Sequence, residues 1–219
     1  HLTTRRQRQM CIRDRLSLAW SGWGKVSAAR AATRLLASDP NIDLLVFTGV
    51  AGAADPTLRQ WDVVLADAVV QHDMDARPLF PRFTLPALNQ DRLQPQQDWF
   101  NWAKTALLEA YDAGGLEGFA RPSSGLIATG DRFIGDAAVL QTLRDDLPGL
   151  RAVEMEGAAV AQVAEQEGIP WLVLRVISDG ADEAAAQSFE DFLQRYEQQA
   201  WRLIEALLQR CNVAPRRCA

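Results

Sequence analysis

The chain has 219 residues, of which 48% are hydrophobic and 23% charged, a composition that suits one soluble globular domain with a sizeable core. It contains no run of 18 apolar residues, so no membrane-spanning helix is expected. Three cysteines, at positions 11, 211 and 218, show neither metal-type spacing nor a disulfide framework, which predicts a reducing, cytoplasmic compartment.

The first fifteen residues, HLTTRRQRQMCIRDR, differ in character from the rest of the chain. An Arg-rich leader is typical of a transit peptide or a nucleic-acid-binding arm. Residues 5–15, however, back-translate into a transposase-type sequencing-library adapter, and we interpret residues 1–15 as a non-native, adapter-derived leader. The remaining chain holds 18 basic and 27 acidic residues, a net charge of −9. With no basic stripe, it is not expected to bind nucleic acid.

The first half of the remaining chain alternates apolar runs with helical stripes. Residues 16–22 predict the end of a buried strand, and residues 23–39 a helix. The apolar run over 42–49 predicts a strand covered on both faces, followed by a second strand over 62–73. Residues 76–96 are rich in Pro, Arg and Phe without periodicity, which predicts a long loop, often a functional feature.

The second half continues the alternation. Strands are predicted over 124–133, 152–156 and 171–180. Helices are predicted over 98–114, 136–149 and 157–168, with one long terminal helix over 188–210. This order predicts an α/β domain over residues 16–212 with a largely parallel sheet, followed by a tail over 213–219.

Polar residues gather where the predicted strands end. They are the pairs or triplets TG (48–49), TGD (129–131), EME (154–156) and SD (178–179). In open α/β sheets, ligands bind at the carboxyl ends of the strands. The sequence therefore predicts a ligand site on this rim.

The EME triplet has two interpretations. Strand alternation places Glu154 and Glu156 on one face, with Met155 on the other, as expected for a pair of ligand-binding carboxylates. Alternatively, Glu156 merely complements the N-terminus of the following helix.

Two further charged residues accompany apolar strands. Asp179 is either a turn or N-cap residue, or a buried carboxyl whose raised pKa allows it to donate a proton near neutrality. Arg175 lies inside an apolar strand and needs an anionic partner, either in a ligand site or in a structural ion pair.

Two glycine- or histidine-containing motifs suggest weaker candidates. FTGVAGAA (47–54) is neither GxGxxG nor GxxxxGK[ST], and no cation stands beside it, so a turn or close approach to a flat ligand fits better than a phosphate cradle. HDMD (72–75) contains metal-ligating residue types, but they would alternate faces on a strand. We predict no metal and no cofactor.

Together, SGWGKV, TGVAG, ATGDRFI, VEMEGAAVA and LRVISDGAD…SF resemble the nucleoside phosphorylase/hydrolase superfamily, over residues 21–192 and in the same order. The nearest branch is that of the methylthioadenosine/S-adenosylhomocysteine nucleosidases. The resemblance implies a three-layer α/β/α fold with a central, twisted mixed sheet whose first strands are missing here. It also implies hydrolysis of the N-ribosidic bond of adenine nucleosides through an oxocarbenium-like transition state.

The resemblance implies a role for each motif residue. Asp179 matches the proton donor to the leaving adenine, Glu156 the carboxylate that binds the ribose hydroxyls, and Arg175 the group that orders the carboxylates and the attacking water. Met155 would lie against the ribose and Phe133 would stack on the base. The remaining substrate-binding positions are Ile134 at the base edge, Trp23 and Phe189 around the 5′ substituent, and Glu154, Ala51, Gly52 and Ser178.

Related phosphorylases carry an arginine before the first glycine of TGVAG, where this chain has Thr48, so water is the favoured nucleophile. The family loop that matches residues 77–86 completes a neighbour's pocket, which implies a homodimer. In the family, a water-activating glutamate lies ahead of the residues that match Leu16. Nothing in the sequence before Leu16 provides it, so we expect marginal folding and low or no turnover. The alternatives are a purine nucleoside phosphorylase, another nucleoside hydrolase, or a degenerate relative that binds nucleosides without cleaving them.

Overall fold

The computed structural model describes residues 16–180 and 192–216 of the chain. Its strands are β1 (Leu45–Ala53), β2 (Val63–Gln71), β3 (Ser123–Thr129), β4 (Leu150–Glu154) and β5 (Trp171–Asp179). Its helices are α1 (Lys25–Ser38), α2 (Gln97–Asp112), α3 (Ala137–Asp146), α4 (Gly157–Gln166), α6 (Trp201–Leu208) and the 3₁₀ turn η1 (Cys211–Val213).

The strands form one mixed sheet that curls into a closed barrel in the order β1-β4-β3-β2-β5. β1 runs parallel to β5, and β3 runs parallel to both β2 and β4. The β1–β4 and β2–β5 pairs are antiparallel. β1 meets β4 only at Gly52 and Ala53, so between Leu45 and Ala51 it has β5 as its one strand neighbour within the described ranges. The predicted α/β fold with a largely parallel mixed sheet is confirmed.

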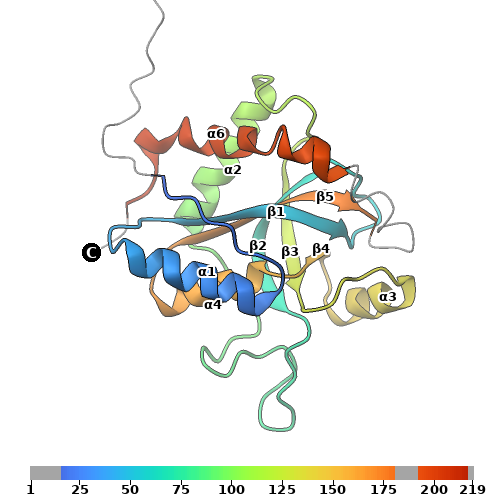
Figure 1. Ribbon diagram of the computed structural model, residues 1–219. Coiled ribbons are helices and arrows are strands. Elements are labelled where there is room, and N and C mark those ends of the chain that lie inside the picture. The colour runs from blue at the N-terminus through green and yellow to red at the C-terminus, as the bar shows by residue number, and fades with distance from the viewer. Residues whose placement is uncertain (1–15, 181–191, 217–219) are drawn as a thin grey trace, which may run out of the picture.

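Helices cover the sheet on opposite sides (Figure 1). α1 packs against α4 on one side, and α2 against α6 on the other. The α1–α4 contact is close because small side chains meet there: Ala28, Ala32, Ala158 and Ala161. The opposite side is filled by larger residues such as Trp99 and Leu203. Among the described residues, none of the helices has the length and apolar character needed to cross a membrane.

Three local predictions need correction. Residues 16–24 form neither helix nor strand, and Leu18 and Trp20 are 83% and 87% exposed, because no described strand lies beside them to take up their backbone hydrogen bonds. The strand predicted over 42–49 is half-buried at residues 46–50 rather than covered on both faces. The terminal helix is interrupted at residues 198–200, where Gln199 and Ala200 both donate to the Tyr196 carbonyl. Residues 188–191 lie outside the described ranges.

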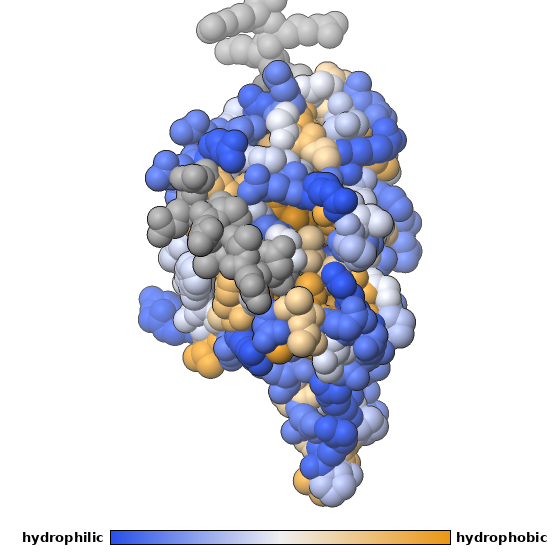
Figure 2. Space-filling view, turned by 90° about the vertical axis from the view of Figure 1, so that its right-hand side faces the viewer, coloured by the Kyte–Doolittle hydropathy of each residue, from blue (hydrophilic) through white to orange (hydrophobic). Residues whose placement is uncertain are grey.

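The predicted long loop is confirmed. It joins β2 to α2 and hangs from the body of the molecule, as Figures 1 and 2 show. Its backbone is tied down by two isolated bridges, Val69↔Leu93 and Leu85↔Gln90, while Leu79 is 84% exposed.

Candidate active site

The carboxyl ends of β3, β4 and β5 carry the predicted polar residues. These strands end at Thr129, Glu154 and Asp179 respectively. The TG pair at 48–49 does not end a strand, contrary to our expectation. β1 continues to Ala53 because its small residues still pair with β5 and β4.

A cavity of about 1150 Å³ opens beside these strand ends. Figure 2 views this side of the molecule, where apolar residues lie at the bottom of a hollow. The cavity is lined by every predicted site residue that the structure describes: Trp23, Ala51, Gly52, Phe133, Ile134, Glu154, Met155, Glu156, Arg175, Ser178 and Asp179. Phe189 lies outside the described residues.

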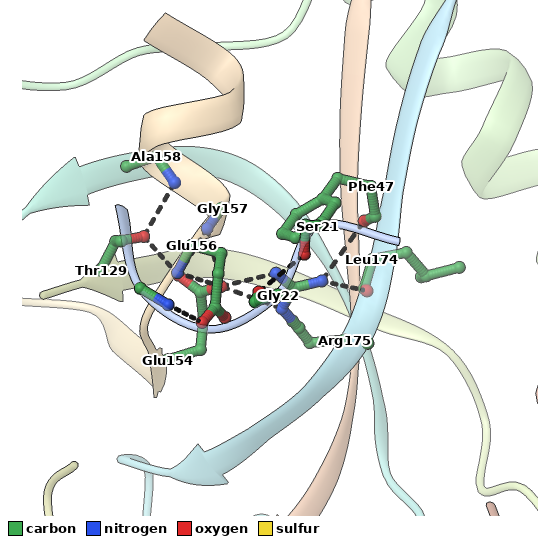
Figure 3. Close-up of polar contacts among 12 residues, drawn as sticks. Ser21, Gly22, Phe47, Thr129, Glu154, Glu156, Gly157, Ala158, Leu174 and Arg175 are labelled. Atoms are coloured by element: carbon green, nitrogen blue, oxygen red, sulfur yellow. Dashed lines mark hydrogen bonds and ion pairs between the residues drawn. The ribbon is translucent and has the colours of Figure 1, made fainter. Parts of the chain in front are cut away.

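Glu154 is the most heavily bonded side chain of the site (Figure 3). Its Oε2 accepts hydrogen bonds from Arg175 Nε and Nη2, at 3.1 and 2.5 Å, and from the Glu156 backbone N–H at 3.2 Å. The Gly157 N–H donates to both oxygens, at 3.0 and 2.8 Å, and the Thr129 hydroxyl donates to Oε1. Its side chain is 2% exposed. These donors occupy the carboxylate within the protein.

Glu154 and Thr129 also cap helix α4. Gly157 donates to Glu154, and the Ala158 N–H donates to Thr129 Oγ1 at 2.8 Å. Glu156 occupies the N-cap position, but its side chain makes no capping bond. The Glu156 side chain therefore does not cap the helix by a hydrogen bond, although its charge still lies at the N-terminus of α4.

The two glutamates point to different partners. β4 ends at Glu154, and Glu156 has φ −138° and ψ −36°, outside the strand conformation. Strand alternation therefore does not apply, and the prediction that both carboxylates share a face for that reason was wrong. Glu156 Oε1 accepts a hydrogen bond of 2.7 Å from the Gly24 backbone N–H, just ahead of α1.

Arg175 is 1% exposed and lies between Glu154 and β1. Its Nη1 donates to the carbonyls of Phe47 and Leu174, at 3.4 and 3.3 Å, and its guanidinium lies 4.4 Å from the centre of the Phe47 ring. The predicted anionic partner is thus Glu154. The ion pair fixes that carboxylate, which in turn fixes the turn that carries Glu156.

Asp179 is held at the end of β5 by its neighbour. The Ser178 hydroxyl lies 2.6 Å from Asp179 Oδ2 and 3.2 Å from the Ala51 carbonyl oxygen. The β1–β5 register shifts here, since Ala51 faces Ile177 and Gly52 faces Asp179. This bulge reaims the end of the strand, and Asp179 lines the cavity while only 8% exposed.

The remaining predicted residues line the cavity with different exposure. Trp23 is 64% exposed and Phe133 44% exposed. The Ile134 side chain is buried in the cluster beneath α3. No group of three or more His, Cys, Asp or Glu residues suitable for a metal ion occurs in the described part of the chain.

Residues 7–209 match the phosphorylase superfamily. The chain belongs to this superfamily. The 5'-methylthioadenosine/S-adenosylhomocysteine nucleosidase of Geobacillus thermodenitrificans is 38% identical over 189 residues, which cover 86% of this chain and 76% of that protein.

Solved structures of this superfamily share the fold. The crystal structure of the Neisseria meningitidis 5'-methylthioadenosine/S-adenosylhomocysteine nucleosidase with methylthio-immucillin-A gives a TM-score of 0.77 at 32% identity, covering 87% of this chain and 79% of that one. Futalosine hydrolase of Helicobacter pylori gives a TM-score of 0.77 at 30% identity, covering 87% and 78%. The resemblance inferred from the motifs is confirmed.

Thr129 was named among the polar residues at the strand ends, but the sequence analysis gave it no individual role in the site. Its hydroxyl joins Glu154 to the first turn of α4. The available signal was a polar residue at the end of an apolar strand, but that position alone does not reveal a bond to a residue 25 positions away.

The environment of Glu156 predicts a pH effect on stability. Burial raises the pKa of its carboxyl above the ordinary 4.5, the hydrogen bond from Gly24 opposes the rise, and the charge of Glu154 adds to it. The folded chain therefore binds this proton more tightly than the unfolded chain. The associated stability is fully present below about pH 4.5 and is lost as the pH rises through the folded pKa.

We expect a Glu156→Gln variant to lack this loss. Its free energy of unfolding, relative to that of the wild type, should therefore increase as the pH rises from 4.5. Urea unfolding of both proteins at several pH values between 4.5 and 8 measures the difference. Parallel pH profiles would show that Glu156 titrates alike in both states.

Proposed function

We propose that the cavity binds an adenine nucleoside and hydrolyses its N-ribosidic bond. The observation that carries the proposal is that Glu156 and Asp179 line the cavity beside the strand ends, while the neighbouring carboxylate of Glu154 is committed to Arg175 and helix α4. One carboxylate is therefore available for the sugar and one for the base.

Asp179 is the proposed proton donor. As the C1′–N bond breaks, its electron pair goes to the base, and a proton from Asp179 neutralises the leaving adenine. Ser178 orients the carboxyl through its 2.6 Å hydrogen bond. Water adds to C1′ and gives up a proton to solvent, and Asp179 takes a proton back from solvent, which completes hydrolysis to adenine and the free sugar.

Glu156 is the proposed sugar-binding residue. A carboxylate accepts hydrogen bonds from two ribose hydroxyls, and its charge stabilises the positive charge that develops on the ring in an oxocarbenium-like transition state. Glu154 and Arg175 act as positioning residues, since the carboxylate of Glu154 is already occupied by protein donors. Met155 is proposed to contact the ribose, Phe133 and the Ile134 backbone the base, and Trp23 the 5′ substituent.

The relatives support this substrate class. The Geobacillus protein is named for methylthioadenosine and S-adenosylhomocysteine, and the Neisseria structure holds methylthio-immucillin-A. The similarity to futalosine hydrolase makes another nucleoside hydrolase the second candidate. We also propose a homodimer in the cytoplasm, on the strength of the family resemblance and of the cysteine pattern.

The test measures adenine release and ligand binding together, so that an enzyme is distinguished from a protein that binds nucleosides without cleaving them. Methylthioadenosine, S-adenosylhomocysteine and inosine are incubated with the chain, with and without phosphate, and free base is quantified by chromatography. Calorimetry measures binding of each nucleoside. We expect adenine nucleosides to bind best and base release to be independent of phosphate. Phosphate-dependent release would indicate a phosphorylase. Tight binding without release would indicate a nucleoside-binding protein. The absence of both binding and release would remove the proposal.

A further inference from the structure

Three charged residues form a closed ring of hydrogen bonds beside the proposed site. The Lys25 backbone N–H donates to Asp131 Oδ1 at 2.8 Å, and the Asp131 backbone N–H donates to Asp73 Oδ2 at 2.9 Å. Lys25 Nζ closes the ring on Asp73 Oδ1 at 2.7 Å. Lys25 is the first residue of α1, and Asp73 and Asp131 lie two residues beyond the ends of β2 and β3. None of them belongs to the site proposed above.

The ring is joined to both halves of that site. Gly24 precedes Lys25 and donates the 2.7 Å hydrogen bond to Glu156, the proposed sugar-binding residue. Asp131 lies two positions before Phe133 in the segment proposed to hold the base. The ring therefore ties the turn that contacts Glu156 to the loop that carries Phe133.

The packing around the ring is tight. Gly24 has φ +84°, and a Cβ added there would lie 3.0 Å from Asp131 Oδ1, so only glycine suits this turn. The Lys25 and Asp73 side chains are 18% and 32% exposed. Lys25 Nζ also donates to Gln71 Oε1 at 3.3 Å, and Gln71 Nε2 donates to Gln162 Oε1 on α4 at 2.7 Å. The ring is thus continuous with the helix that follows Glu156.

Asp73 remains charged in this arrangement. Burial acts to raise the pKa of its carboxyl, but hydrogen bonds from Lys25 and from the Asp131 backbone outweigh it and lower the pKa. A charged acceptor strengthens both bonds that it receives.

We infer that Lys25, Asp73 and Asp131 form a positioning ring that sets the distance between the sugar-binding carboxylate and the base-binding loop. The inference rests on the proposed function. The three residues act through Gly24 and through the loop 131–134, and not by touching substrate. A ring of this kind holds two half-sites in register, so its loss penalises a ligand that spans both halves more than a ligand that fills one.

The experiment compares two ligands, methylthioadenosine and adenine. In an Asp73→Ala variant, we expect the dissociation constant of the nucleoside to rise about tenfold or more, and that of adenine to rise clearly less. In the same variant, the rate of adenine release is expected to decrease together with the affinity for the nucleoside. A merely structural role for Asp73 would leave the ratio of the two dissociation constants unchanged.

A second substitution keeps the test decisive if Asp73→Ala does not fold. Asp131→Ala removes the acceptor of the Lys25 N–H and is expected to change the same ratio. Asp131→Asn retains an oxygen acceptor and is expected to restore it towards the wild-type value. The matched control is Asp112→Asn, in an exposed ion pair with Arg121 on the far side of the sheet, which should leave the ratio unchanged.

The outcomes separate this inference from the proposed function. If the wild-type chain binds methylthioadenosine and the Asp73→Ala and Asp131→Ala proteins are folded with the wild-type ratio, the positioning ring is wrong while the proposed site stands. If the folded wild-type chain binds neither ligand, the proposed site is wrong and the ring falls with it.

Discussion

An Asp179→Asn variant is expected to release adenine about 10²- to 10⁴-fold more slowly than the wild-type chain, the range typical of a lost general acid. The amide cannot supply an acidic proton to the leaving base. Its oxygen still accepts the Ser178 hydroxyl, which lies 2.6 Å from Asp179 Oδ2, so the end of β5 should remain in place. Single-turnover assays with protein in excess measure the rate even when turnover is slow.

The affinity of the variant for methylthioadenosine shows whether the substitution affects the chemical step alone or also the structure of the site. The affinity of Asp179→Asn for methylthioadenosine is expected to stay within a few-fold of wild type, because the proton is needed only as the bond breaks. Asp91→Asn, an exposed carboxyl in the loop after β2, is the matched control and should have no effect. Unchanged adenine release in both Asp179→Asn and Glu156→Gln would remove the basis of the proposed mechanism.

An Arg175→Met variant is expected to lose about 3–5 kcal/mol of the free energy of unfolding. Arg175 and Glu154 have side chains that are each 2% exposed, so removal of the guanidinium leaves an uncompensated buried carboxylate. Urea unfolding at pH 7 measures the loss. Since small domains are stable by only about 5–15 kcal/mol, this one substitution should remove a large share of the stability of the chain.

Two controls test whether the loss of stability comes from the buried, uncompensated carboxylate of Glu154. Arg121→Met breaks an exposed ion pair and should cost below about 1 kcal/mol. Glu154→Gln in the Arg175→Met background removes the stranded charge while keeping an oxygen acceptor for Gly157, and should recover part of the loss. A cost for Arg175→Met as small as that of Arg121→Met would mean that water reaches Glu154.

The sequence predicted the order of the elements well because its signals are local. Apolar runs marked β2 and β5, and helical stripes marked α1, α2 and α4. Local signals failed where a neighbour decides the outcome. Residues 16–22 are as apolar as a strand but have no described strand beside them, and the glycine at 49 did not stop β1 because β5 continues alongside it.

The sequence allowed us to predict which residues line the candidate site, but not which partner each of them binds. Every predicted site residue in the described ranges lines the cavity, because parallel strand ends meet on one rim. The separate tasks of Glu154 and Glu156 could not be predicted, since they depend on partners far along the chain. Gly24 and Glu156 are 132 positions apart, and Lys25 and Asp131 are 106 apart.

The closure of the sheet through only two residue pairs has a consequence for the purified protein. From Leu45 to Ala51, within the described ranges, the outer edge of β1 offers backbone donors and acceptors that no second strand takes up. Half-buried apolar side chains accompany that edge. Such an edge is a template for strand addition between molecules. Aggregation at high concentration should therefore begin at β1, and dilute solutions suit the measurements above.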